Sequence, residues 1–192
     1  MKKALLLAAL TAAVAGTHIQ AQAQSATYAI DPTHTQVVFE AKHFGVSTNR
    51  GRWDKKEGTV TLDKTAKTGK VELTIDMASI STGIGPFDGH LKSKDFFAAE
   101  EFPTAKFVGD KFTFNGDKVA SVGGELTLRG KTLPVTLTAT SFGCYENPRL
   151  KREVCGGDFE TTIQRSQWGM SYGLPGIPDT VRLLIQAEAI KQ

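Results

Sequence analysis

The sequence predicts an all-β protein whose antiparallel strands close into a barrel, with a short helical insertion closing one end. Three observations support this prediction. Apolar and polar residues alternate through most of the chain, as they do in strands with one buried face. Glycine-containing turns separate the alternating segments, and no long stretch has helical periodicity. One internal stretch, from Asp76 to Phe107, breaks the alternation and holds enough residues for two helical turns.

The clearest expected strand is Thr35 to His43, which places Val37, Phe39, Ala41 and His43 on one face. Further strands are expected at residues 28–31, 58–62, 71–76, 105–107, 112–114, 125–128, 133–140, 159–165 and 181–189, with a loop at 45–51. Antiparallel strands in this number, eight or more, close most simply into an up-and-down barrel. An eight-stranded barrel is either filled by side chains or holds one small ligand. A β-sandwich is the alternative architecture.

Residues 1–23 are predicted to be a secretory signal peptide. Lys2 and Lys3 precede a short apolar run, and Ala21-Gln22-Ala23 forms a small-x-small cleavage site. Residues 24–192 are then one exported, soluble domain, with a core of ordinary size and no later membrane span. The net charge is +3, and loss of the two lysines lowers it to +1, which argues against nucleic acid as a partner.

Cys144 and Cys155 are the two cysteines, and an even count in an exported chain favours a disulfide. The bridge would close a short loop that contains Pro148. A metal pair is the competing interpretation, but the histidines lie far away in sequence and the cysteine spacing does not match a metal motif.

The stretch from Asp76 to Phe107 carries four phenylalanines and the pair Asp88 and His90, so we expect it to close an apolar cavity. Asp88 and His90 could cap or tie the insertion, contact a ligand head group, or act in acid–base or metal chemistry. The third option lacks a third metal ligand and a nucleophile motif.

Arg165 falls in phase with Phe159 and Ile163, so period-two geometry points it into the barrel. A buried arginine needs partners. Two interpretations stay open: an ion pair with an acid such as Asp88, or a contact to the polar head of a ligand. His43 lies on the inward face of its strand and is a second candidate at the mouth.

Several motifs resemble the YceI-like family in chain order. They are Tyr28 to Phe39, Lys42 to Ser47, Ser79 to Gly83, Asp88 to Phe97, and three later runs: Phe-Pro-Thr-Ala-Lys-Phe, Gly-Glu-Leu-Thr-Leu-Arg-Gly-Lys-Thr-Leu-Pro-Val and Ile-Gln-Arg-Ser-Gln-Trp-Gly-Met. The resemblance implies an extended, lipocalin-like eight-stranded barrel in the periplasm. It also implies binding of a long isoprenoid chain, such as a polyprenyl lipid or quinone, or of a similar amphiphile. One departure is Phe87, where the family usually has a charged residue before the aspartate.

The predicted cavity wall comprises Phe39, Phe44, Trp53, Leu73, Ile75, Ile84, Phe87, Leu91, Phe96, Phe97, Phe102, Phe107, Leu126, Leu128, Ile163, Trp168, Leu183 and Ile185. The predicted head-group residues are His43, Asp88, His90 and Arg165.

No metal, and no cofactor beyond the bound lipid or quinone, is expected. A membrane redox protein is a candidate partner, and the protein would be a monomer or homodimer. Two alternatives to a lipid carrier are an enzyme that uses Asp88, His90 and Arg165 on such a lipid, and a filled barrel that binds another protein.

Overall fold

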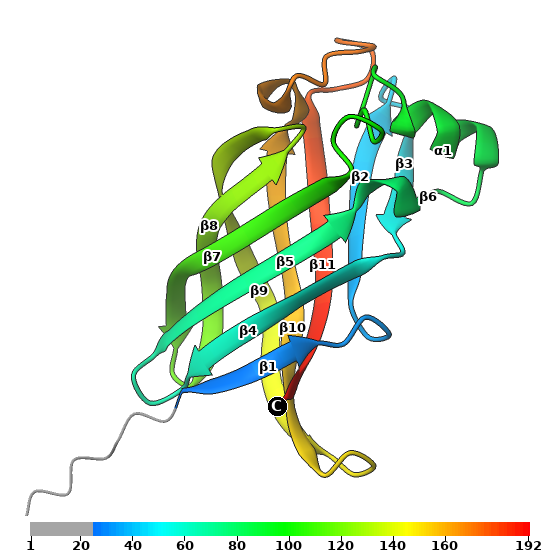
Figure 1. The fold of residues 1–192 in the computed structure, drawn as a ribbon. Helices are drawn as coiled ribbons and strands as arrows, with labels where there is room; N and C mark the ends of the chain where they lie inside the picture. The colour runs from blue at the N-terminus through cyan, green and yellow to red at the C-terminus, as the bar shows by residue number, and fades with distance from the viewer. Residues whose placement is uncertain (1–24) are drawn as a thin grey trace, which may run out of the picture.

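Eight antiparallel strands close into a barrel in the computed structural model, which describes residues 25–192 (Figure 1). Around the ring these are β1 (Ala26–Ile30), β4 (Lys56–Asp63), β5 (Thr68–Asp76), β7 (Thr104–Asn115), β8 (Lys118–Leu128), β9 (Lys131–Asn147), β10 (Arg152–Gln164) and β11 (Thr180–Lys191). The pairing of β1 with β11, with Tyr28 opposite Lys191, completes the ring. The all-β barrel prediction is confirmed, whereas the signal peptide prediction lies outside the described residues.

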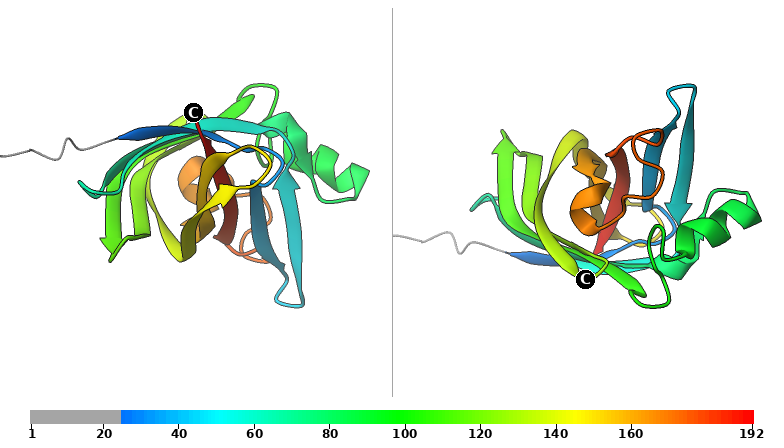
Figure 2. Two further views of the ribbon diagram at one scale, coloured as in Figure 1. Left: turned by 90° about the horizontal axis from the view of Figure 1, so that it is seen from below. Right: turned by 90° about the horizontal axis from the view of Figure 1, so that it is seen from above.

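The sheet continues beyond the ring at one end, which is the upper end in Figure 1. There β11 leaves β1 and pairs instead with β2 (Gln36–His43), which pairs with β3 (Ser47–Trp53) and through it with β6 (Ile80–Ser81). Seen along the barrel axis, β2 and β3 extend away from the ring, and the orange segment around residue 165 lies over the opening (Figure 2). At this end β11 is therefore no longer paired with β1, and β2 takes that place.

Three short helical elements lie at the upper end. The 3-10 turn η1 (Met77–Ser79) leads from β5 to β6, and α1 (Gly85–Lys92) follows. A proline in the first turn suits α1, because proline lacks only an N–H that has no partner there. The turn η2 (Arg165–Trp168) lies between β10 and β11.

Three local predictions were wrong. Residues 45–51, expected as a loop, include most of β3, which was missed because its sequence is polar and contains Gly51. A β-carbon there would lie 2.5 Å from the ring of Phe39, so the glycine makes room for that ring. The two strands expected at 105–107 and 112–114 are the single strand β7, whose register shifts between Gly109 and Lys111. Arg165 begins η2 and does not continue β10.

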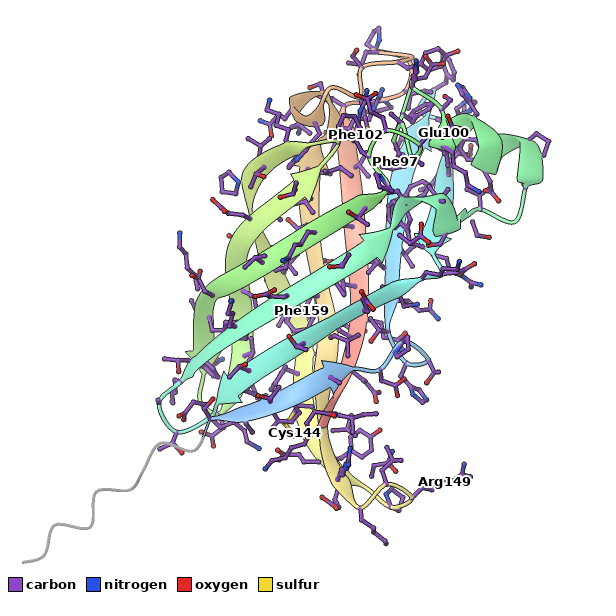
Figure 3. The ribbon with its side chains drawn as sticks, viewed as in Figure 1. Phe97, Glu100, Phe102, Cys144, Arg149 and Phe159 are labelled. Atoms are coloured by element: carbon purple, nitrogen blue, oxygen red, sulfur yellow. A yellow bond between two sulfur atoms is a disulfide. The ribbon has the colours of Figure 1, made fainter. Side chains whose placement is uncertain are left out.

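The lower half of the barrel is packed. Its inward side chains include Tyr28, Leu62 and Val122, all buried, and only a small void of about 90 Å³ remains among them. Phe159 points into this half (Figure 3). Because interiors of this density leave little free volume, space for a ligand lies mainly in the upper half.

The cysteines form a disulfide, as predicted. Cys144 on β9 lies opposite Cys155 on β10, in a hairpin that extends below the barrel to the turn at Arg149 (Figure 3). Since both sulfur atoms are bonded to each other, neither is available as a thiolate ligand, and the metal-pair alternative is wrong.

Replacing both cysteines with alanine should lower the free energy of unfolding by about 2–3 kcal/mol, because the bridge constrains a short loop in the unfolded chain. Urea denaturation of the oxidised protein and the variant measures this difference. Reductant should bring the wild type to the midpoint of the variant and leave the variant unchanged. Equal midpoints under oxidising conditions would show that the bridge contributes nothing.

Candidate functional site

A cavity of about 790 Å³ occupies the upper half of the barrel. This volume lies within the range of about 300–1,000 Å³ that is usual for small-molecule sites. Its wall is almost entirely apolar and is built by β2, β3, β5, β7, β8, β10 and β11, together with α1 and the segment after η2. Among the described residues, Arg165 is the one Lys, Arg, Asp or Glu side chain in this wall.

Most of the predicted wall residues line this cavity. They are Phe39, Phe44, Trp53, Ile75, Ile84, Phe87, Leu91, Phe96, Phe97, Leu126, Leu128, Ile163 and Leu183. Leu73, Phe107 and Ile185 lie lower and line the small void instead, because each lies two residues deeper along its strand than a cavity residue.

Phe102 and Trp168 line neither space. Phe102 packs against Gly130, where an added β-carbon would lie 2.8 Å from its ring. The indole N–H of Trp168 donates to the carbonyl of Leu126 at 3.3 Å, so this side chain holds η2 against β8. Both residues secure the upper end without facing the cavity.

The insertion closes one side of the cavity, as its phenylalanines suggested. Phe87 and Leu91 of α1 and Phe96 and Phe97 of the following segment line the cavity. Figure 3 shows Phe97, Glu100 and Phe102 at the upper end of the molecule.

Asp88 does not line the cavity. Its carboxylate accepts hydrogen bonds from the backbone N–H of Thr82 at 2.7 Å and from the Thr82 hydroxyl at 2.6 Å. Asp88 therefore ties the preceding loop to α1, as one of the structural interpretations expected. It is not the N-cap, which is Ile84. The assignment of Asp88 to the head-group region is not supported, since its side chain is engaged outside the cavity.

Arg165 is buried, with 3% of its surface exposed, and it makes no ion pair with Asp88. Its guanidinium donates to three backbone carbonyls, those of Met170 at 2.7 Å, Ile177 at 2.8 Å and Pro178 at 3.0 Å. Burial lowers the pKa of Arg165 and the nearby Asp179 carboxylate raises it, but an arginine remains protonated. The interpretation as an ion pair with Asp88 is thus wrong. Arg165 instead holds residues 170–178 in place through these hydrogen bonds, and we call these residues the braced segment.

The braced segment was not identified from the sequence, although Met170, Tyr172 and Ile177 line the cavity. Gly169 and Gly173 adopt positive φ angles there, so the chain turns without any alternation that would reveal its inward side. Val37, Ala41 and Val181 also line the cavity but were not in the predicted wall. They share inward strand faces with predicted wall residues, so the alternation could have identified them.

Besides Arg165, the polar side chains of the described residues that line the cavity are His43, Asn49, His90 and Tyr172. The ring of His90 lies edge-on to Phe96 and Tyr172, with centroids 5.0 Å and 5.1 Å away. Its Nε2 atom lies 3.4 Å from the Asp95 carboxylate. Of the three residues proposed for catalysis, Asp88 and Arg165 are held by separate structural contacts, so the structure does not assemble them into an acid–base group.

Trp53 is the cavity residue with an unsatisfied polar atom. Its indole N–H is buried and, among the described residues, has no hydrogen-bond partner, while its ring packs against Phe39 and Phe97. Such a group costs free energy in the folded protein, and a bound acceptor oxygen would relieve that cost.

Trp53→Phe should therefore destabilise the ligand-free protein less than Trp168→Phe, by about 1 kcal/mol, because only the second change breaks a hydrogen bond. The two substitutions remove the same atoms from buried indoles, so each is the matched control of the other. Denaturant midpoints of both delipidated variants give the comparison. A larger loss for Trp53→Phe would show that its N–H has a partner in solution.

A family model described as a YceI-like domain matches residues 28–189 of this chain. The protein belongs to the YceI-like family. A UPF0312 protein of Pseudomonas aeruginosa is 34% identical over 195 residues, covering 100% of both chains. The crystal structure of BcnA from Burkholderia cenocepacia aligns with a TM-score of 0.67 at 24% identity, covering 83% of this chain and 99% of that one.

A second solved structure, described as a polyisoprenoid binding domain from Saccharophagus degradans implicated in plant cell wall breakdown, has a TM-score of 0.60. It is 16% identical, and the alignment covers 86% of this chain and 98% of that one. At these identities both structures establish the YceI-like barrel fold. Among the described residues of this YceI-like chain, no helix has the length and apolarity needed to cross a membrane.

Proposed function

We propose that this YceI-like protein is a periplasmic carrier or reservoir that holds a long isoprenoid chain, or a similar amphiphile, in the upper cavity of its barrel. The observation that carries the proposal is the contrast between the two halves of one barrel. The lower half retains about 90 Å³ of free space, whereas the upper half retains about 790 Å³ behind an apolar wall. An apolar space of this size suits a lipid tail, and the likeness of the fold to a domain described as polyisoprenoid-binding adds support.

The head group of this lipid is uncharged in our proposal, as in a prenyl alcohol or a quinone. A diphosphate needs several free cationic or N–H donors. Three of the five N–H groups of the Arg165 guanidinium already donate to backbone carbonyls, which leaves two, and among residues 25–192 no lysine joins Arg165 in the cavity wall. His43, Asn49, His90 and Tyr172 offer single hydrogen bonds of the kind that a carbonyl or hydroxyl group uses.

A periplasmic location is supported by the signal-like residues 1–23 and by the disulfide, since disulfides persist in oxidising compartments. If the ligand is a quinone, a membrane redox protein is the partner that would accept it.

Native mass spectrometry of the protein purified from its host without detergent tests this proposal. We expect a non-covalent adduct that dissociates on activation and whose mass fits a prenyl chain with an uncharged head. Protein of the bare polypeptide mass alone would contradict the carrier function. An adduct with a diphosphate head would leave the carrier function standing and contradict the head-group assignment.

A further inference from the structure

The large apolar side chains that are exposed on this protein gather mainly at one end. Phe44 and Val46 lie at the tip of the β2–β3 hairpin, Ile84 lies just before α1, and Tyr172 and Leu174 lie in the braced segment. Val46 is the most exposed of them, at 88%. We call these five residues the apolar rim. The two other exposed large hydrophobics of the described chain, Tyr145 and Leu150, belong to the hairpin at the lower end.

The apolar rim is continuous with the cavity. Phe44, Ile84 and Tyr172 are exposed and also line the cavity wall. The backbone N–H of Phe44 donates to the carbonyl of Gly176 at 3.0 Å. The Phe44 ring lies so close to Gly176 that an added β-carbon would clash with it at 2.4 Å. The hairpin tip and the braced segment are thus joined into one surface around the mouth.

We propose that the apolar rim docks this protein onto the surface of a lipid bilayer, with the cavity mouth facing the acyl chains. The inference rests on the proposed carrier function. Each buried methylene contributes about 0.8 kcal/mol relative to water. For a tail of several isoprene units, the free energy of transfer from water into the cavity would by this measure exceed about −18 to −21 kcal/mol, the limit that real complexes reach. A tail released into water is therefore very unfavourable. Exchange through water is correspondingly slow, and direct contact between the mouth and a membrane avoids it.

The small size of the rim, and the lysines beside it that have no ion-pair partner among the described residues, favour a bilayer over a second copy of the chain. A stable protein interface uses about 20–30 residues on each side, far more than these five loop residues. Exposed Lys42 lies beside the hairpin tip, and Lys92 and Lys94 lie at the end of α1. None of the three takes part in an ion pair of the described residues. Asp95, Glu100 and Glu101 lie in the segment after α1 and offset the charge of the three lysines, so anionic lipid should add only modestly to binding.

Vesicle flotation with the full mature protein tests the docking surface. The probe is vesicles of phosphatidylcholine, with and without phosphatidylglycerol. Val46→Asp places a charge at the hairpin tip but does not touch the cavity, and Leu150→Asp makes the same kind of change at the opposite end. We expect Val46→Asp to weaken flotation about tenfold or more, and Leu150→Asp to float like the wild type. Lys42→Gln should lower the affinity for vesicles that contain phosphatidylglycerol about fivefold and leave the affinity for pure phosphatidylcholine vesicles unchanged.

Native mass spectrometry of the same samples separates this inference from the carrier function. Val46→Asp should lose vesicle binding and carry less lipid than the wild type, because the lipid tail would have to enter through water, whereas Leu150→Asp should match the wild type in both measurements. A wild type that carries the adduct but does not float would keep the carrier function and exclude docking. A wild type that does not float, equal flotation of both aspartate variants, or concentration-dependent dimerisation that Val46→Asp abolishes would each overturn bilayer docking. Loss of the adduct from the wild type would contradict the carrier function instead.

Discussion

Arg165→Met should lower the free energy of unfolding by about 3–5 kcal/mol and empty the cavity of lipid. The guanidinium satisfies the carbonyls of Met170, Ile177 and Pro178, and methionine leaves all three without this partner. Because Met170 and Ile177 also line the cavity, release of the segment opens its wall. Denaturant unfolding measures the first effect, and the lipid adduct in native mass spectrometry measures the second.

Arg182→Met is the matched control for this substitution. Arg182 is exposed and pairs with Glu40 and Glu160 on the outer face, so its loss should cost at most about 1 kcal/mol and leave the adduct in place. Equal stability losses for the two arginine variants would contradict the bracing role of Arg165. A folded Arg165→Met protein that keeps its lipid would show that the braced segment is not needed to retain it.

The double substitution Ala41→Trp and Ala105→Trp should reduce retained lipid at least tenfold while changing the free energy of unfolding little. Ala41 on β2 and Ala105 on β7 both line the cavity, so two indole rings would occupy space that the tail needs. Overpacking usually costs about 1–3 kcal/mol in a filled core. Here the rings enter an existing space, and burial of their apolar surface offsets the strain. Lipid extraction and mass spectrometry give the occupancy.

Thr138→Trp is the control for the added rings, since Thr138 is exposed on β9 and adds an indole to the outer surface. This variant should carry as much lipid as the wild type. If the double variant retains full lipid, the ligand does not lie between β2 and β7. If instead it unfolds at much lower denaturant concentration than the wild type, the cavity is not the open space described above.

The barrel could be predicted because period-two alternation survives in its strands. Phe39, Ile163 and Leu183 were placed on inward faces by that alternation alone, and they line the cavity. The division of the barrel into a packed half and a hollow half could not be predicted. Leu73 and Ile75 share a face and differ in sequence by two positions, yet they lie beside different spaces.

The role of Arg165 could not be predicted for a related reason. Its phase with Ile163 gave the correct inward direction, but the strand ends at Gln164 and the chain turns into η2. The partners of the guanidinium are backbone carbonyls of a glycine-containing loop, which leave no pattern of side-chain types in the sequence. An acid such as Asp88 therefore looked like the natural partner, although the loop geometry provides a different one.

A crystal structure of the protein purified from its host, without detergent or added lipid, would show whether a lipid tail occupies the upper cavity. We expect continuous, elongated density in the upper cavity, running between the mouth at His90 and Tyr172 and the wall at Trp53. Side chains that meet across the upper half, or a cavity that contains only ordered water, would contradict it.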